Sequence, residues 1–184
     1  MIICIIGKSG SGKDTVARLL QEWYGYVPVC SYTTRPIREN ETDGIEHYFI
    51  SQEEAEIMMG GRPDDIVAQT VINNNIYFAM IENLLEADIY VIDPKGVEYI
   101  QQHFPDIELF QLYVYCNDDI AMERARKRGD DMNVYVSRHL DESPMFNDYF
   151  NRGMYDKVID NSCDFETMKK RLREMFDTLR NSLR

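Results

Sequence analysis

The sequence of 184 residues has little of what marks membrane proteins, disulfide-rich secreted proteins or metal-binding proteins. No apolar run reaches the roughly 18 residues that a membrane-spanning helix needs, and no segment is patterned like a signal peptide. We therefore expect a soluble, cytoplasmic protein. Buried thiols are a better interpretation of the scattered cysteines than a disulfide framework or a metal site: Cys4, Cys30, Cys116 and Cys163.

Positive charge is also scarce. The chain has 20 Lys and Arg residues against 32 Asp and Glu residues, a formal net charge of −12. Such a surface is typical neither of nucleic-acid binding nor of binding to anionic membranes, so we expect no partner of either kind. An anionic ligand must therefore bind where arginines are locally concentrated.

A glycine-rich segment, Gly7-Lys8-Ser9-Gly10-Ser11-Gly12-Lys13, follows the apolar run 2–6 and precedes a helical pattern. Strand, loop and helix in this order are typical of a phosphate-binding loop. The glycines let the backbone curl so that N–H groups surround an anion, and the lysine adds charge at the β- and γ-phosphates. We assign these residues to a nucleoside triphosphate: Gly7, Lys8, Ser9, Gly10, Ser11, Gly12, Lys13, Asp14 and Thr15.

Asp14 departs from the usual loop pattern. A Ser or Thr hydroxyl normally meets Mg²⁺ at this position, and here the nearest hydroxyl, that of Thr15, comes one residue later. The carboxylate either binds the metal itself or only complements the positive end of the helix dipole. Both interpretations stay open at this point.

The first concentration of arginine is the segment 31–38, which continues through residues 43–51. Arg35 and Arg38, with nearby hydroxyls, are suited to holding a phosphate in a bidentate grip. The alternative is a solvated loop in which these arginines pair with nearby carboxylates: Glu39, Glu41 and Asp43.

The second concentration lies at the end of a predicted helix that begins at Asn117 or Asp118 and stops at Gly129. Arg124 and Arg128 there either complement the helix dipole or close over bound phosphates. Arg138 follows on a second helical stretch.

Five segments, in serial order over essentially the whole chain, together resemble the guanylate kinase family of P-loop nucleoside monophosphate kinases. They are the loop 7–13, the segment 31–36 with Asp43-Gly44, the strand end 92–96, the helix end with Arg124 and Arg128-Gly129, and the tail 155–161.

The resemblance implies an enzyme that transfers the γ-phosphoryl group of ATP to GMP or dGMP with Mg²⁺, and small-molecule nucleotides as partners. Asn161 then lies beside the donor base, and Asp14 and Asp93 are candidate metal ligands. The implied catalytic residues are Lys13, Arg124, Arg128 and Arg138. The implied acceptor-binding residues are Ser31, Arg35, Arg38, His47, Tyr48, Gln69, Tyr77 and Asp93.

Three positions depart from the family pattern on the acceptor side. The family's acceptor tyrosine falls on His47, with Tyr48 next to it. Its guanine-reading glutamate falls on Ala68, with Gln69 adjacent, and its hydroxyl partner falls on Ala79. Phosphate binding therefore matches the family, while base selection stays open.

Two alternatives remain for the function. Ribose bisphosphate phosphokinases resemble guanylate kinases and can carry Gly-Lys-Asp at the end of the loop, and the missing guanine readers fit such an acceptor. A non-catalytic guanylate-kinase-like binding module is the third reading. Lys13 and the arginines Arg124, Arg128 and Arg138 argue against it, because a pure binding surface has no use for donor-phosphate contacts.

The alternation of strands and helices predicts an α/β fold with a five-stranded parallel sheet flanked by helices. We place its strands near residues 2–6, 27–30, 88–92, 109–115 and 156–159. The core then comprises residues 1–31, 80–123 and 153–184, with a mixed strand-and-helix acceptor module at 32–79 and a helical lid at 124–152. The acceptor module contains a hairpin of residues 66–71 and 76–79 around an Asn73-Asn74-Asn75 turn.

Overall fold

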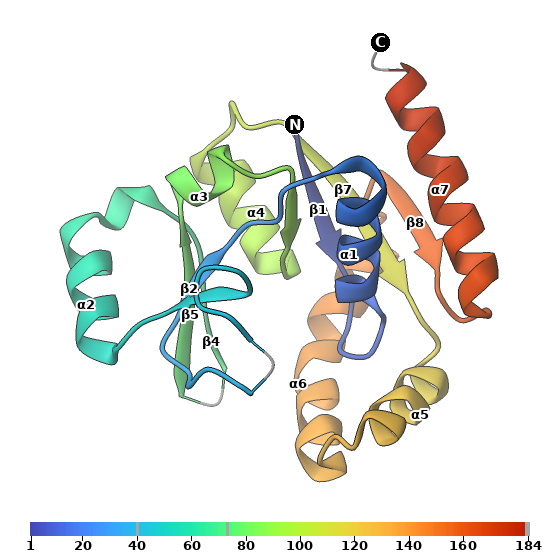
Figure 1. Cartoon of the computed structure of the whole chain (residues 1–184), viewed down its shortest axis with the longest axis horizontal. Coiled ribbons are helices and arrows are strands. Elements are labelled where there is room, and N and C mark those ends of the chain that lie inside the picture. Colours follow the sequence, from blue (N-terminus) through green and yellow to red (C-terminus); the bar gives the residue numbers. More distant parts are fainter. Residues whose placement is uncertain (40, 73, 183–184) are drawn as a thin grey trace.

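The computed structural model describes residues 1–39, 41–72 and 74–182. Its core is a four-stranded parallel sheet of strand order β6-β1-β7-β8. The strands are β1 (Ile2–Ile6), β6 (Ile89–Val91), β7 (Leu109–Tyr115) and β8 (Lys157–Asp160). Their carboxyl ends point towards two helices, α5 (Asp118–Arg128) and α6 (Met132–Asn151) (Figure 1).

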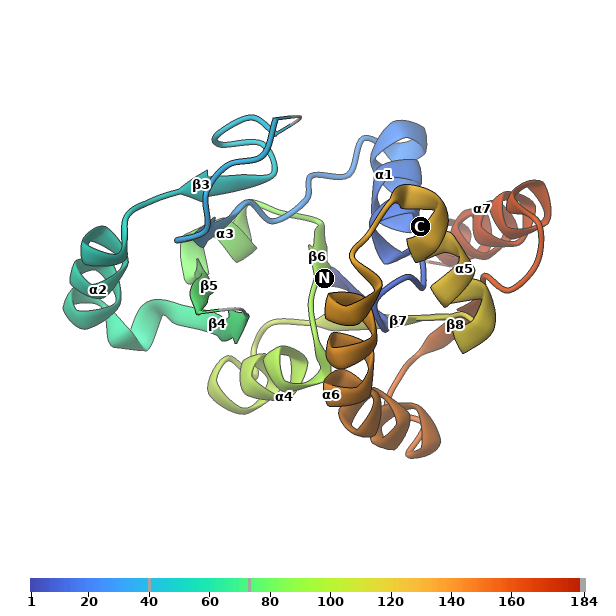
Figure 2. The ribbon, with the colours of Figure 1, turned by 90° about the horizontal axis from the view of Figure 1, so that it is seen from below.

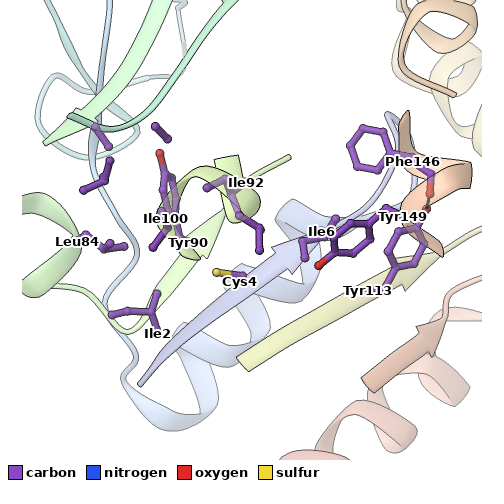
Figure 3. Packing of buried hydrophobic residues seen from close by; sticks show 14 residues of the cluster. Ile2, Cys4, Ile6, Leu84, Tyr90, Ile92, Ile100, Tyr113, Phe146 and Tyr149 are labelled. Atoms are coloured by element: carbon purple, nitrogen blue, oxygen red, sulfur yellow. Dashed lines mark hydrogen bonds between the residues drawn. The ribbon is translucent and has the colours of Figure 1, made fainter. Parts of the chain in front are cut away.

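Strand β1 is the centre of the core because all five of its residues are apolar and buried. Ile3 and Ile5 face a cluster that includes α1 (Lys13–Tyr24) and α7 (Phe165–Ser182). Ile2, Cys4 and Ile6 face the other cluster, with α4 (Pro94–His103) and the end of α6 (Figure 3). Helices thus cover both faces of the sheet, as an apolar parallel sheet requires.

The predicted fifth strand is wrong in detail. Residues 27–30 form no strand, and Pro28 makes only an isolated parallel bridge to Ile89 at the edge of the sheet. Proline has no N–H to donate to a ladder, so only the flanking residues bond to the sheet. The Val29 N–H donates to the Ile89 carbonyl over 2.7 Å, and the Val27 carbonyl accepts from the N–H groups of residues 88 and 89.

A second, mixed sheet of order β3-β2-β5-β4 stands beside the core (Figures 1 and 2). Its strands are β2 (Ser31–Thr33), β3 (His47–Phe49), β4 (Ile66–Ile72) and β5 (Asn75–Met80). Helix α2 (Gln52–Gly61), a 3₁₀ turn (Pro63–Asp65) and α3 (Ile81–Leu85) complete this part. The strands at the hairpin turn are longer than predicted, because Asn75 already belongs to β5; Asn73 lies outside the described residues.

The ends of α5 match the sequence signals. The Asn117 side chain accepts a hydrogen bond from the Asp119 N–H, and Gly129 ends the helix with a φ of 81°. This left-handed conformation favours glycine. Across the described ranges, none of the helices is both long and apolar enough to cross a membrane.

Candidate active site

A cavity of about 830 Å³ opens at the carboxyl ends of the core strands, between the second sheet and α6. Open α/β sheets usually bind ligands at this end. Its walls combine residues of the core, of the second sheet and of α6. Eight residues predicted for the site line this cavity: Gly7, Lys13, Ser31, His47, Gln69, Tyr77, Asp93 and Arg138.

The phosphate loop joins β1 to α1. Gly12 caps the helix with a φ of 90°, and a Cβ at this position would lie 2.3 Å from the Asn161 side-chain nitrogen. Only glycine fits this conformation and this space. The Ser11 hydroxyl in the same loop is buried, and the described contacts give it no hydrogen-bond partner. Ser11 is not among the residues that line the cavity, so this hydroxyl lies inside the loop and not at the cavity wall.

Asn161 and Arg124 support this loop. The buried Asn161 side chain donates to the Ser11 carbonyl over 2.7 Å, and the Arg124 guanidinium donates to the Asn161 carbonyl over 2.9 Å. Both residues thus lie behind the loop, and neither is among the residues that line the cavity. Their predicted contacts with the donor base and phosphates remain predictions.

Two further residues of the loop contact the helical pair α5–α6. Lys8 pairs with Asp118 over 2.7 Å. Ser9 donates its backbone N–H and its hydroxyl to the carboxylate of Glu142. Glu142 is not among the predicted site residues, although it follows Arg138 by one helical turn, a spacing at which an acid and an arginine can pair.

Arg35 is buried and is not among the residues that line the cavity. Its guanidinium donates two hydrogen bonds to Glu41, of 2.6 and 2.5 Å, and lies 5.0 Å from the centre of the Phe49 ring. These bonds are the main reason why the pKa of the Glu41 carboxyl falls to about 2. Arg35 thus forms one of the carboxylate pairs of the alternative prediction, but this pair is buried and not solvated, whereas the Arg38 side chain is exposed.

His47, and not Tyr48, lies at the cavity. Its Nδ1 is 2.9 Å from the Ser31 hydroxyl. Burial, and after it the charge of Arg35, lowers the pKa of His47 below its ordinary value and so favours the neutral imidazole. Tyr48 stacks on Tyr32 and lines a separate, smaller cavity.

The register of the hairpin decides which side chains share a face. Thr70 is opposite Tyr77, and Ala68 is opposite Ala79, so these four side chains lie on one face of the strand pair. Gln69 is opposite Phe78, whose ring packs on the other face with Ala55 and Met80 of a separate cluster. Thr70 is therefore a better candidate than Gln69 for contact with an acceptor base, and it is not among the predicted site residues.

The two candidate metal ligands differ in their surroundings. Asp14 is exposed in the first turn of α1, whereas Asp93 uses its Oδ1 to accept a hydrogen bond from the Gly96 N–H over 2.8 Å and so caps α4. In the part of the chain that the structure describes, no group of three or more His, Cys, Asp or Glu residues could hold a metal. Arg128 lies at the end of α5, where it pairs with Asp130 over 2.6 Å.

The family can now be decided by comparison. A family model described as guanylate kinase matches residues 1–179. The chain belongs to the guanylate kinase family. Guanylate kinase of Symbiobacterium thermophilum is 31% identical over 170 residues, which cover 88% of this chain and 77% of the relative. That of Fusobacterium nucleatum is 29% identical over 164 residues and covers 86% of each chain.

Solved structures agree on the fold of this guanylate kinase family member. The crystal structure of guanylate kinase from Anaplasma phagocytophilum matches 99% of this chain and 85% of its own, with a TM-score of 0.62 and 18% identity. A deoxyadenosine kinase from M. mycoides, solved with bound dATP, matches with a TM-score of 0.51 and 14% identity. At these identities the likeness concerns the fold alone.

Proposed function

We propose that this protein is a guanylate kinase, which transfers the γ-phosphoryl group of ATP to GMP or dGMP and yields ADP and GDP or dGDP. One observation carries the proposal beyond family membership. Lys13 of the phosphate loop, Tyr77 and Ser31 of the second sheet, and Arg138 of α6 all line one cavity. Donor and acceptor phosphates can therefore meet there without a protein nucleophile.

The donor side follows from the loop. Its N–H groups and the Lys13 ammonium neutralise the negative charge that the phosphates carry during transfer. Arg138 already lies at the cavity, whereas Arg124 and Arg128 rest against Asn161 and Asp130. We therefore assign residues 124–152 to a lid whose closure brings these two arginines to the phosphates and excludes water.

The acceptor side belongs to residues 32–79, with Ser31 at its border, while residues 1–31, 80–123 and 153–184 form the core. Arg35, Arg38 and Tyr77 hold the acceptor phosphate in line with the donor. Arg35 reaches it by exchanging Glu41 for the phosphate, or by binding both through its five N–H donors.

Mg²⁺ fits the donor set of this site. Magnesium prefers oxygen ligands and is usually held by one or two carboxylates together with substrate phosphates. Asp14 offers an exposed carboxylate beside the loop, and Asp93 keeps its second oxygen after capping α4. The bound ion would supply positive charge between the phosphates of ATP.

A second acceptor class remains because of one local feature. Ala68 and Ala79 present only methyl groups where a guanine base would need polar partners, and the neighbouring hydroxyl is that of Thr70. A phosphorylated sugar needs no base reader, so a sugar-phosphate kinase fits this wall as well. We prefer base recognition by Thr70 and by the residues of α6 that line the cavity.

The test is an acceptor panel with ATP and Mg²⁺, in which chromatography measures both the ADP and the second product. The panel contains GMP, dGMP, AMP, CMP, UMP and ribose bisphosphate. The proposal predicts the highest kcat/KM for GMP or dGMP. Turnover with the sugar phosphate alone would favour the second class, and ATP binding without any turnover would favour a binding module.

A further inference from the structure

Glu142 occupies part of the phosphate loop in this structure. The Ser9 backbone N–H donates to its Oε1 over 2.5 Å, and the Ser9 hydroxyl donates to its Oε2 over 3.0 Å. The Glu142 side chain is only 13% exposed, so these bonds replace water at a buried carboxylate. A loop that is built to bind anions thus already holds one, supplied by the protein itself.

The contact is part of a wider attachment of α5 and α6 to the loop. The Tyr135 hydroxyl donates to the Ser9 carbonyl over 3.1 Å. Asp118, at the start of α5, pairs with Lys8 over 2.7 Å and lies 3.5 Å from His139 Nε2. Because these contacts hold α6 against residues 8–9, the position of Glu142 follows from the packing of its helix and not from a loose side chain.

The partners of Glu142 are those that a phosphate oxygen would take. Besides the N–H and hydroxyl of Ser9, the carboxylate pairs with Arg138, one helical turn earlier, over 3.6 Å. A loop N–H, a loop hydroxyl and an arginine form a typical phosphate-binding set. In this structure Glu142 therefore accepts from both Ser9 donors and pairs with the charge of Arg138.

We propose that Glu142 is a determinant of donor affinity, which acts as a placeholder for a phosphate oxygen of ATP on Ser9. The inference rests on the proposed donor site. Donor binding must displace the carboxylate, because two anions cannot share the Ser9 N–H. The displaced Glu142 releases Arg138 to pair with the incoming phosphate. The favourable free energy of ATP binding is thereby reduced by the free energy of the carboxylate contacts.

The experiment measures the Kd of ATP with Mg²⁺ by calorimetry on the whole chain. Glu142→Ala removes the placeholder, and the expected result is an affinity about tenfold higher than that of the wild type, equivalent to ~1.4 kcal/mol. Glu142→Gln keeps the shape without the charge and gives an intermediate gain; it also serves if the alanine variant does not fold.

Asp148→Asn is the matched control, because Asp148 is an exposed acid of the same helix that pairs with Arg152 over 3.2 Å and is not among the residues that line the cavity. Its Kd is expected to stay within about twofold of the wild type, which separates displacement from a general loss of negative charge.

A second readout is thermal stability. Saturating ATP is expected to raise the melting temperature of Glu142→Ala by more than that of the wild type. Two results overturn the inference: equal or weaker ATP binding by both Glu142 variants while the wild type binds ATP, or an equal gain in Asp148→Asn. Failure of every protein to bind ATP would overturn the donor site itself, and the placeholder with it.

Discussion

The buried pair of Arg35 and Glu41 allows a quantitative test of the acceptor site. The side chains of these residues are 9% and 13% exposed, and they are joined by two hydrogen bonds. Glu41→Ala leaves the guanidinium buried without its partner. Breaking a buried ion pair in this way typically costs 3–5 kcal/mol. We take the lower end, about 3 kcal/mol, because neither side chain is fully buried.

For a chain of this size, a loss of ~1 kcal/mol lowers the melting temperature by about 2–4 °C. We therefore expect Glu41→Ala to melt about 6–12 °C below the wild type. Glu39→Ala is the matched control, since Glu39 is an exposed acid in the same loop, and its unfolding free energy should change by less than about 0.5 kcal/mol.

The assay is thermal and urea denaturation at pH 7, with and without GMP. If Arg35 binds the acceptor phosphate, GMP supplies the missing anion and should stabilise Glu41→Ala more than the wild type. A Glu41→Ala variant as stable as the wild type would refute the energetic argument. An equal GMP effect in both proteins would refute the assignment of Arg35 to the acceptor phosphate.

Three further predictions follow from single contacts. If the Asp14 carboxylate binds Mg²⁺, Asp14→Asn raises the Mg²⁺ concentration needed for half-maximal activity, and Asp14→Ser retains substantial activity. Coincident Mg²⁺ titrations would leave Asp14 as a helix-start residue, worth roughly 0.3–1 kcal/mol of stability. Ala68→Glu is expected to raise the GMP-to-AMP ratio of kcat/KM about tenfold or more, because a charged hydrogen bond is worth ~1.5–3 kcal/mol. Gln69→Ala, on the opposite face of the strand, should leave that ratio unchanged, and a reversed pattern would contradict the hairpin register. The folded-state pKa of Glu41 is about 2 against an ordinary 4.5, so the stabilisation by this carboxylate is complete above pH 4.5 and is lost as pH falls towards 2. The difference in unfolding free energy between wild type and Glu41→Ala should shrink over that range, and a constant difference would argue against the ion pair.

Local signals were sufficient for much of the fold. Five apolar residues followed by glycines and a helical pattern predicted β1, the loop and α1, and Gly129 marked the end of α5. The segment 27–30 misled because its apolar residues are typical of a strand, while Pro28 restricts it to one bridge at the sheet edge. Hydrophobicity alone does not count the N–H groups that a ladder requires.

The details of the site depend on contacts between distant residues. Glu142 and Ser9 are 133 residues apart, so no local pattern joins them. Gln69 was predicted from its adjacency to the family's glutamate position, whereas the alternation of faces along a strand places Thr70 on the same face as Ala68 and Tyr77. Arg35 was expected to bind phosphate or a nearby acid, and only the folded loop shows that Glu41 holds it.

The most direct test of the central claim follows the transferred phosphoryl group. The wild type and Lys13→Ala are incubated with γ-labelled ATP, GMP and Mg²⁺, and the label is traced by chromatography, with Lys170→Ala as an exposed lysine control. We predict that the wild type and the control move the label from ATP to GDP, and that Lys13→Ala does so at least about 10²-fold more slowly while remaining folded. Label that never appears in GDP, or a folded Lys13→Ala with wild-type turnover, would contradict this account.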